Sequence, residues 1–223
     1  MNNNQKSKVA IFDYGLGNLF SIKHACNYAG MEPFIISSAH RLMEADLIIL
    51  PGVGAFGDAM ESLRRLDLIS PLHDIVDSGK LLMGICLGMQ LLMSESHEFG
   101  NHKGLDIIKG EVVKFDKPLD TNGKTLKVPH VSWNKIYLTD KQHKIFQNLN
   151  DETYMYFVHS FYVKPDNVSN IIFNTYYGNI EFCSGILYNN IFACQFHPER
   201  SGPKGLSIYK NLDSIIRSKK QIF

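Results

Sequence analysis

The first half of the chain alternates short apolar runs with segments in which apolar residues recur every three or four positions. Buried parallel strands read as continuous apolar runs, whereas helices that bury one face show the longer period. The pattern therefore predicts βαβ units and a mainly parallel sheet. We expect strands at 8–15, 32–37, 45–52 and 81–85, and helical segments at 18–30 and at 58–80, the latter broken near Pro71.

The second half contains short runs rich in aromatic and β-branched residues, separated by turn residues. Such runs are typical of strands joined by tight turns, and here they predict an antiparallel extension of the sheet. We expect strands at 107–115, 154–163, 170–178, 183–189 and 191–199, and a closing helix at 205–220. No linker or repeat divides the sequence, so we predict one α/β domain over residues 1–223.

Composition narrows the classes of function. The 23 basic and 22 acidic residues nearly cancel, so net charge gives no attraction to nucleic acid or to an anionic membrane. The four cysteines form no C-x-x-C pair and show no disulfide-like spacing, which fits reduced thiols in the cytosol. No signal peptide or membrane span is evident, because the longest nearly apolar run, 81–93, is too short for a bilayer. We expect a soluble cytoplasmic protein.

One cysteine lies where a nucleophile is expected. Cys86 follows the apolar run 81–85, and Gly84 and Gly88 flank it at two positions on either side. This G-x-C-x-G turn matches the strand-to-helix elbow that exposes the serine of G-x-S-x-G enzymes. The glycines let neighbouring backbone pass where a Cβ would clash, and the amides at the start of the following helix favour thiolate over thiol. A buried core cysteine is the simpler alternative.

The segment "ACQFHPERS" supplies a base and an acid for such a nucleophile. Along an extended strand Gln195, His197 and Glu199 share one face, while Cys194 and Phe196 point into the core. His197 would exchange a proton with Cys86, and Glu199 would fix its tautomer. Because Cys194 points away from His197, the two make a poor metal pair. We therefore predict a Cys86–His197–Glu199 triad with no metal or other cofactor.

Two glycine-rich turns follow other predicted strands. In "PGVGAFG" the amides of Gly52 and Val53 are candidates, with that of Leu87, for binding an oxyanion. A simple turn before a helix is the alternative there. In "YGLGNLF" the third glycine of a dinucleotide fingerprint is replaced by Phe20, which argues against nucleotide binding.

With the triad in view, the chain resembles the class I (triad-type) glutamine amidotransferases. It is most similar to the family of glutaminase subunits of imidazole glycerol phosphate synthase. The resemblance covers nearly the whole chain and implies the flavodoxin-like α/β fold of that class. It rests on "FDYGLGNL", "LPGVGAFGDAM", "GICLGMQLL", "VPHVSWN", "YFVHSFYV" and "FACQFHPERS", which stand in the family's order.

The resemblance implies the reaction and further site residues. Cys86 would attack the side-chain amide of glutamine, form a glutamyl thioester and release ammonia. Gln90 and the backbone of Ser160 and Phe161 would bind the substrate. The family works as a heterodimer with a (β/α)8-barrel cyclase, which receives the ammonia. The positions that match its partner interface are Asn18, Trp133, Asn134, Tyr156 and Arg200.

Several alternatives remain open from the sequence. Trp133 is equally suited to the core of the strand-rich half or to an interface, and His159 would either line the site or support a loop. Ser132 stands where the family usually has glycine and Arg200 where it often has lysine, both on the partner side. The acceptor could therefore be a surface-polysaccharide sugar, as in related subunits. An inactive binding scaffold and a cysteine peptidase or esterase are the other readings.

Overall fold

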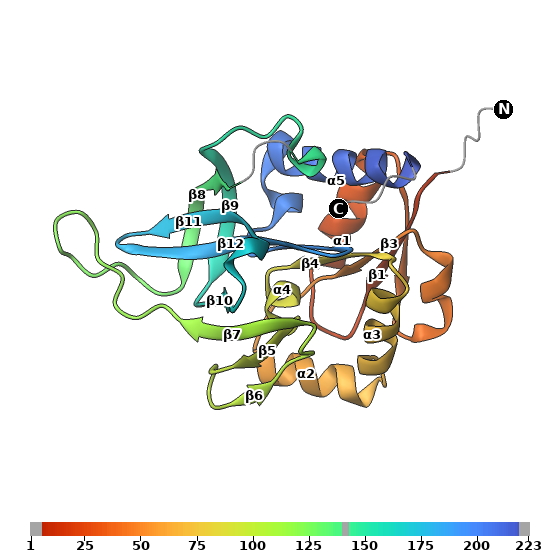
Figure 1. The fold of residues 1–223 in the computed structure, drawn as a ribbon, viewed down its shortest axis with the longest axis horizontal. Helices are drawn as coiled ribbons and strands as arrows, with labels where there is room; N and C mark the ends of the chain where they lie inside the picture. The colour runs from red at the N-terminus through yellow and green to blue at the C-terminus, as the bar shows by residue number, and fades with distance from the viewer. Residues whose placement is uncertain (1–5, 140–142, 219–223) are drawn as a thin grey trace.

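The computed structural model describes residues 6–139 and 143–218 and arranges them around one sheet (Figure 1). Five neighbouring strands of this sheet are parallel and have the order β2-β1-β3-β4-β13, which is the order of flavodoxin-like folds. These strands are β1 (Lys8–Phe12), β2 (Glu32–Ile36), β3 (Leu47–Leu50), β4 (Leu81–Ile85) and β13 (Ile191–Cys194). The predicted mainly parallel α/β fold is confirmed.

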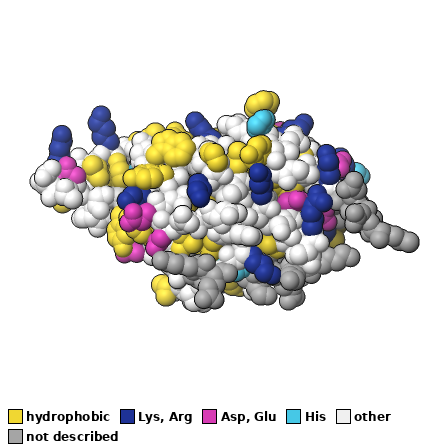
Figure 2. All heavy atoms as spheres, turned by 90° about the horizontal axis from the view of Figure 1, so that it is seen from above, with side chains coloured by type: hydrophobic (Ala, Val, Ile, Leu, Met, Phe, Trp, Pro, Cys, Tyr) yellow, Lys and Arg dark blue, Asp and Glu magenta, His cyan; other side chains and the backbone are white. Residues whose placement is uncertain are grey.

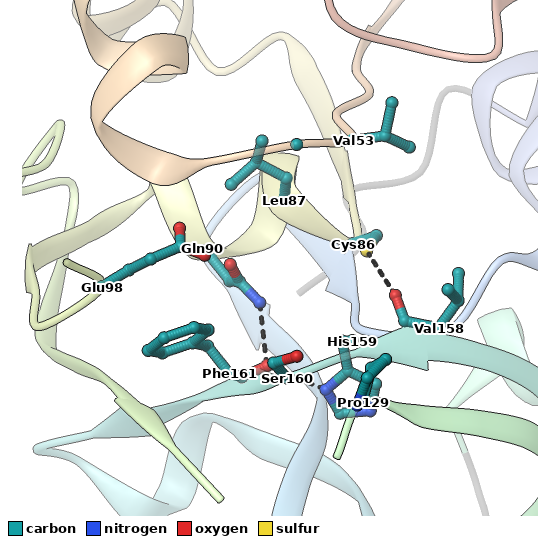
Figure 3. Close-up of a pocket in the computed structure, with 11 residues that line it drawn as sticks. Val53, Cys86, Leu87, Gln90, Glu98, Pro129, Val158, His159, Ser160 and Phe161 are labelled. Carbon is teal, nitrogen blue, oxygen red and sulfur yellow. Dashed lines mark hydrogen bonds between the residues drawn. The ribbon is translucent and has the colours of Figure 1, made fainter.

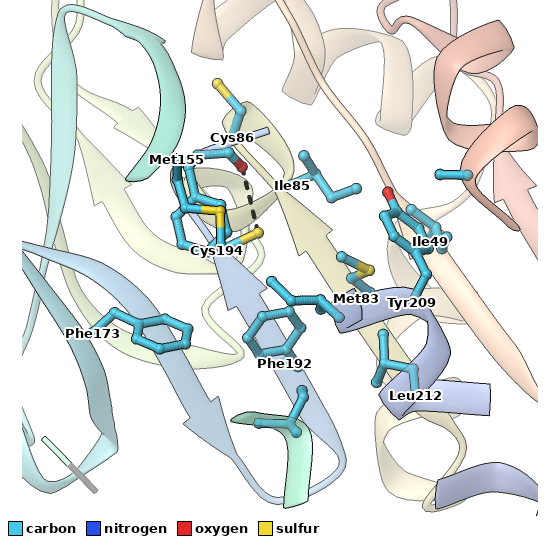
Figure 4. Close-up of a cluster of buried hydrophobic side chains, with 14 of the residues drawn as sticks. Ile49, Met83, Ile85, Cys86, Met155, Phe173, Phe192, Cys194, Tyr209 and Leu212 are labelled. Atoms are coloured by element: carbon cyan, nitrogen blue, oxygen red, sulfur yellow. Dashed lines mark hydrogen bonds between the residues drawn. The ribbon is translucent and has the colours of Figure 1, made fainter. Parts of the chain in front are cut away.

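Helices cover both faces of the parallel strands, which bury apolar side chains on each side. One face packs against α1 (Leu19–Tyr28) and α5 (Gly202–Arg217), and the other against α2 (Phe56–Arg65) and α3 (Ile69–Asp77). Figure 4 shows the first of these layers, in which Tyr209 and Leu212 of α5 pack near Met83 of β4. The carboxyl ends of β4 and β13 are therefore held in a buried part of the sheet.

The antiparallel extension begins at β12 (Ile180–Tyr188), which pairs with β13. Beyond it the sheet continues through β10, β7, β5 and β6, in which β5 and β7 pair in parallel, while β11, β8 and β9 branch from β12. Their bounds are β5 (Met93–Ser96), β6 (His102–Lys103), β7 (Ile108–Lys114), β8 (His130–Leu138), β9 (Thr153–His159), β10 (Phe161–Pro165) and β11 (Ile171–Tyr177). Short helical turns complete the described residues, namely α4 (Leu87–Leu91), η1 (Ala39–Glu44), η2 (Lys144–Phe146), η3 (Val168–Asn170) and η4 (Pro198–Arg200).

The helical segment 58–80 is broken near Pro71, as expected. The break lies around Asp67, whose φ of 52° follows the end of α2, and proline is tolerated in the first turn of α3. Other expectations about the elements were wrong. The single run 154–163 is two strands separated at Ser160. The strand β8 was not expected at all.

Parts of other expectations lie outside the described residues. These are the N-terminal residues 1–5 and the last two residues of the predicted closing helix, Lys219 and Lys220. In the described part of the chain, no helix is long and apolar enough to cross a membrane.

Candidate active site

Cys86 occupies a strained turn between β4 and α4. Its φ of 55° and ψ of −110° lie where residues other than glycine are rare, and such strain is typical of functional sites. The Cys86 amide donates to the Cys194 carbonyl at 2.8 Å, which ties the turn to the end of β13. A Cβ at Gly84 would lie 3.1 Å from the carbonyl oxygen of Gly88, and a Cβ at Gly88 would overlap the carbonyl oxygen of Leu50. The flanking glycines therefore allow the close backbone approaches that form this elbow.

His197 and Glu199 form a buried pair directly after β13. His197 Nδ1 lies 2.8 Å from Glu199 Oε1, and the two side chains are 5% and 1% exposed. Strand alternation does not create this pair, because β13 ends at Cys194 and the 3-10 turn η4 begins at Pro198. The turn brings the carboxylate back onto the imidazole. The backbone amide of His197 donates to Tyr156 on β9 at 2.9 Å, which fixes the histidine from a second side.

The charges around His197 favour its protonated form. Burial lowers its pKa, but Cys86 and Glu199 outweigh burial and raise the pKa from 6.5 to about 10. Because Nδ1 donates to Glu199, Nε2 is the nitrogen left to exchange a proton with Cys86. Nε2 is buried and makes no hydrogen bond of ordinary geometry within the described residues, although Cys86 contributes to its raised pKa. The arrangement can hold a thiolate beside an imidazolium.

The predicted oxyanion residues lie against the elbow. A Cβ at Gly52 would come within 2.8 Å of the Leu87 Cβ and 3.1 Å of the Gly88 amide nitrogen, so the two turns are in direct contact. Val53 and Leu87 both line the cavity that contains Cys86 (Figure 3). Tyr14, which had no predicted role, also supports this site. Its buried hydroxyl donates to the Pro51 carbonyl and so holds the turn that carries Gly52.

A cavity of about 250 Å³ opens beside Cys86. Drug-sized ligands need about 300–1,000 Å³, so this volume suits a smaller molecule such as an amino acid. Figure 3 shows Val53, Leu87 and Cys86 on one wall and the β9–β10 turn on the other. The lining residues are Val53, Gly54, Cys86, Leu87, Gln90, Glu98, Pro129, Val158, His159, Ser160 and Phe161.

Glu98 is a charged residue of the cavity lining that was not predicted from the sequence. It lies across the cavity from Val158, and its Oε2 accepts a hydrogen bond from the Phe56 amide at 2.6 Å (Figure 3). A carboxylate held in this way can bind an ammonium group of a ligand. No sequence signal distinguished Glu98 from the other acidic residues, because it stands in a loop after β5.

Gln90, which lines the cavity, and the fully buried Gln195 form a pair of side-chain amides. Gln90 Nε2 donates to the carbonyl of Phe161 and to Gln195 Oε1, both at 3.0 Å. Gln195 Nε2 in turn lies 3.6 Å from Cys86 Sγ. The predicted substrate residues Gln90 and Phe161 are therefore connected to the nucleophile through one side chain.

His159 both lines the cavity and supports the β9–β10 turn. Its Nδ1 donates to the Phe161 carbonyl at 2.8 Å, and its Nε2 lies 3.1 Å from His130 Nδ1. Burial lowers the pKa of His159 to about 3 and that of His130 to about 4. Both imidazoles are neutral at neutral pH, so each has one donor and one acceptor nitrogen, and the pair forms an ordered chain of hydrogen bonds ending at Phe161.

The predicted interface residues fall into two groups. Trp133 packs edge-on against Tyr156, with ring centroids 6.1 Å apart, and the Arg200 guanidinium lies 4.6 Å from the centre of the Tyr156 ring. Trp133 is 52% exposed, so the core alternative for this residue is wrong. Asn18 caps α1, which packs on the η4 turn that carries Arg200. Asn134 is separate, because its side-chain amide donates to the Tyr176 carbonyl at 2.8 Å.

Three further observations concern the surface, the buried residues next to the site and the metal-ligating side chains. On the face in Figure 2, lysine and arginine side chains are spread along the molecule and form no single basic patch. Cys194 and Phe196 are fully buried in the core, as predicted, with Cys194 directed away from the Cys86 sulfur (Figure 4). Among the residues with described positions, no group of three or more His, Cys, Asp or Glu side chains could hold a metal ion.

Comparisons with known proteins give the class to which the chain and its fold belong. The family model for class I glutamine amidotransferases matches residues 10–213. A chain of the Thermotoga maritima PurLQS structure has a TM-score of 0.73, with 21% identity over 97% of this chain and 100% of that chain. This likeness shows that the fold is the same.

Relatives at higher identity resolve the family further. Imidazole glycerol phosphate synthase subunit HisH of Chlorobaculum tepidum is 43% identical, covering 91% of this chain and 98% of the relative. The HisH subunit of Sulfurimonas denitrificans is 45% identical, covering 91% and 96%. The fold and the matched family model are those of class I glutamine amidotransferases. The chain belongs to this class and, within it, to the family of the imidazole glycerol phosphate synthase subunit HisH.

Proposed function

We propose that this chain hydrolyses L-glutamine to L-glutamate and ammonia through a Cys86–His197–Glu199 triad. The observation that carries the proposal is the strained Cys86 turn beside the buried His197–Glu199 pair and a cavity of amino-acid size. A nucleophile, a base and an orienting acid in this order are what amide hydrolysis requires. No metal or organic cofactor enters the mechanism.

The first half of the reaction forms a thioester. The Cys86 thiolate attacks the side-chain amide carbon of glutamine, and the negative charge that develops on oxygen is stabilised by the amides of Val53 and Leu87, with Gly52 contributing to the same turn. His197 then donates its proton from Nε2 to the departing nitrogen. The carbon–nitrogen bond breaks, and ammonia leaves the glutamyl thioester.

The second half regenerates the enzyme. A water molecule attacks the thioester carbonyl while His197, now neutral, accepts a proton from it. The carbon–sulfur bond breaks, and glutamate leaves as the Cys86 thiolate re-forms beside the imidazolium. Glu199 keeps Nδ1 protonated throughout, so that Nε2 alone exchanges protons.

The cavity wall suggests how glutamine is held. The carboxylate of Glu98 is placed to pair with the α-ammonium group, because it is the one acidic side chain among the lining residues. Ser160 and Phe161 in the β9–β10 turn offer backbone groups to the amino acid end. Gln90 supports that turn through its hydrogen bond to the Phe161 carbonyl.

We propose that the ammonia is used by a partner subunit. Tyr156 accepts the His197 amide through its carbonyl, and its ring belongs to the exposed cluster with Trp133 and Arg200. A partner docked on this cluster would receive the ammonia that leaves the Cys86 thioester beside His197. Transfer inside a complex makes chemical sense, because ammonia in neutral water is mostly protonated and no longer nucleophilic.

The family of the chain suggests the identity of this partner. We propose a heterodimer with the (β/α)8-barrel cyclase subunit HisF, which would convert N'-(5'-phosphoribulosyl)formimino-AICAR-phosphate (PRFAR) to imidazole glycerol phosphate and AICAR in L-histidine biosynthesis. The relatives named HisH support this assignment. We further propose that residues 1–223 act as one amidotransferase domain in the cytoplasm, without nucleic acid or membrane as a partner.

The test is glutamate release from glutamine by the purified chain, alone and with HisF and the phosphoribulosyl substrate. We expect little release alone, strong stimulation in the complex, and none with Cys86→Ala. Release that the histidine-pathway substrate fails to stimulate would move the acceptor to a surface sugar. Turnover of peptides or esters without glutamine would indicate a hydrolase of another kind. Absence of release under every condition would favour the inactive scaffold.

A further inference from the structure

Gln195 is a fully buried side chain in contact with the nucleophile. Its Nε2 lies 3.6 Å from Cys86 Sγ, within hydrogen-bond range for sulfur. The proposed reaction steps give it no role, and it stands in the bend directly after β13, between Cys194, which faces the core, and His197. A polar side chain with no exposed surface costs free energy unless its groups are paired, so its partners indicate what it does.

The orientation of the Gln195 amide follows from its neighbours. Gln90 Nε2 contacts two acceptor positions, the Phe161 carbonyl and Gln195 Oε1, so the Gln90 nitrogen is the donor to both. The oxygen of Gln195 therefore faces Gln90, and its NH₂ group faces the Cys86 sulfur. A reversed amide would direct two NH₂ groups at each other and lose both hydrogen bonds.

The sulfur thus lies between an acceptor and a donor. The Val158 carbonyl, 3.9 Å from Cys86 Sγ, can accept a hydrogen bond only from the neutral thiol. The Gln195 amide can donate to the thiolate, and a donor to a charged acceptor forms the stronger bond. Of these two contacts, Gln195 gives the shorter one and favours the charged form.

We propose that Gln195 is a catalytic residue whose side-chain amide donates a hydrogen bond to the Cys86 thiolate, stabilising the nucleophile and holding it on the cavity side of the elbow. This inference rests on the proposed role of Cys86 as the nucleophile. Gln90 acts as its positioning residue, because it fixes the amide in the donating orientation. The pair therefore links the turn that holds Phe161 to the reactivity of the sulfur.

The test measures alkylation of Cys86 by iodoacetamide as a function of pH, without glutamine. Gln195→Leu keeps the size of the side chain and removes the donor. We expect the midpoint of the alkylation profile to move upward by about one pH unit or more, with about tenfold slower labelling on the acidic side, since hydrogen bonds to charged groups have this strength. Gln195→Glu places a carboxylate beside the sulfur and is expected to move the midpoint further.

Two more variants separate this role from simple packing. Thr175→Val removes the buried Thr175–Ser184 hydrogen bond of 2.8 Å without touching Cys86, and is expected to leave the alkylation profile unchanged. Gln90→Leu frees the Gln195 amide to rotate, and is expected to shift the midpoint in the same direction by a smaller amount. Gln90→Leu therefore tests the same effect on Cys86 alkylation if a Gln195 variant fails to fold.

The outcomes are distinct from those of the glutaminase test. Unchanged midpoints in folded Gln195→Leu and Gln195→Glu would overturn the inference, even if glutamine hydrolysis is demonstrated. If both fail to fold, an unchanged midpoint in Gln90→Leu would overturn it. A shift in the Gln195 variants with an unchanged Thr175→Val profile would support it, whatever the acceptor of the ammonia. Cys86→Ala identifies the signal, because its labelling is expected to be absent.

Discussion

The backbone at Gly88 packs so closely against the carbonyl group of Leu50 that a Cβ atom there would overlap the carbonyl oxygen. Leu50 ends β3 and Gly88 lies in α4, so this contact sets the distance between the glycine-rich turn after β3 and the Cys86 elbow. The two turns carry the residues proposed to bind the oxyanion. The distance between the two turns therefore depends on the absence of a side chain at Gly88.

Gly88→Ala should accordingly destabilise the fold and abolish activity. Backbone atoms cannot move aside as a flexible side chain can, so we expect a loss of about 3 kcal/mol in the free energy of unfolding, at the upper end for overpacking. Urea unfolding measures it. Gly17→Ala is the matched control, because its nearest new contact is a proline side-chain atom at 3.3 Å, and less than about 1 kcal/mol should be lost. Equal losses in both variants would contradict the argument.

Local patterns predicted the elements that form the site better than the contacts between them. The run 81–85 is β4 as predicted, and glycines around Cys86 mark a turn because only glycine tolerates the close approaches seen there. The His197–Glu199 contact arises from a 3-10 turn that Pro198 starts, which alternation along a strand did not predict. Residues two positions apart can meet either on one face of a strand or across a 3-10 turn. The predicted side-chain pair is therefore present, although the backbone conformation predicted for it was wrong.

The remaining site residues depend on distant parts of the chain. Glu98 reaches the cavity because the loop after β5 returns towards the first turn of α2, where it binds the Phe56 amide. The Gln195–Gln90 pair joins residues 105 positions apart. Non-local contacts of this kind leave no periodicity in a single sequence, so pattern analysis could not supply them.

Glu199→Gln should reduce turnover far more than it reduces stability. The glutamine side chain carries no negative charge, so it binds the Nδ1–H group of His197 less strongly than the carboxylate does. The tautomer that is protonated at Nδ1 and the imidazolium are therefore both less favoured. We expect kcat for glutamine hydrolysis in the complex to fall by about 10²- to 10⁴-fold. Glu181→Gln provides a control, because its carboxylate bonds Asn174 instead of a catalytic group. A fall of less than about threefold would remove Glu199 from the triad.

Glu98→Gln should act on binding. If this carboxylate pairs with the α-ammonium group of glutamine, removing its charge raises KM by about ten- to a hundredfold, the value of a hydrogen bond between charged groups. The value of kcat should change much less, because the contact is equal in the ground state and the transition state. Steady-state kinetics measure both constants. Glu95→Gln is the neighbouring control, since Glu95 faces Lys103. An unchanged KM in Glu98→Gln would contradict this assignment.

Trp133→Ala should weaken the complex without unfolding the chain. Half of the Trp133 side chain is exposed beside Tyr156, and large exposed aromatics are typical anchors of interfaces. We expect the Kd for the barrel subunit to rise by at least about tenfold, as for other hot-spot residues, with little change in melting temperature. Val168→Ala removes another exposed hydrophobic side chain, on η3, and should leave the Kd unchanged. Equal Kd values for wild type and Trp133→Ala would show that the Trp133–Tyr156 cluster is not part of the interface.

The buried His130–His159 pair should make the fold sensitive to mild acid. Burial depresses the pKa values of these side chains to about 4 and about 3, from 6.5 in the unfolded chain. Between about pH 6 and pH 4.5 the unfolded state therefore binds protons that the folded state does not, and stability decreases as pH falls. We expect the free energy of unfolding, measured with urea, to fall with decreasing pH by on the order of 1 kcal/mol per pH unit over this range.

Two further observations make this pH dependence specific. The raised pKa of His197 changes the free energy of unfolding in the opposite direction and in another pH range. The stabilisation by His197 is complete below pH 6.5 and is lost as pH rises through about 10. His130→Phe removes one titrating group while keeping a ring against Phe157 and Tyr177, so the acid slope should become shallower. His24→Gln, at an exposed position on α1, should keep the wild-type slope. A slope in His130→Phe as steep as in the wild type would show that other groups cause the acid sensitivity.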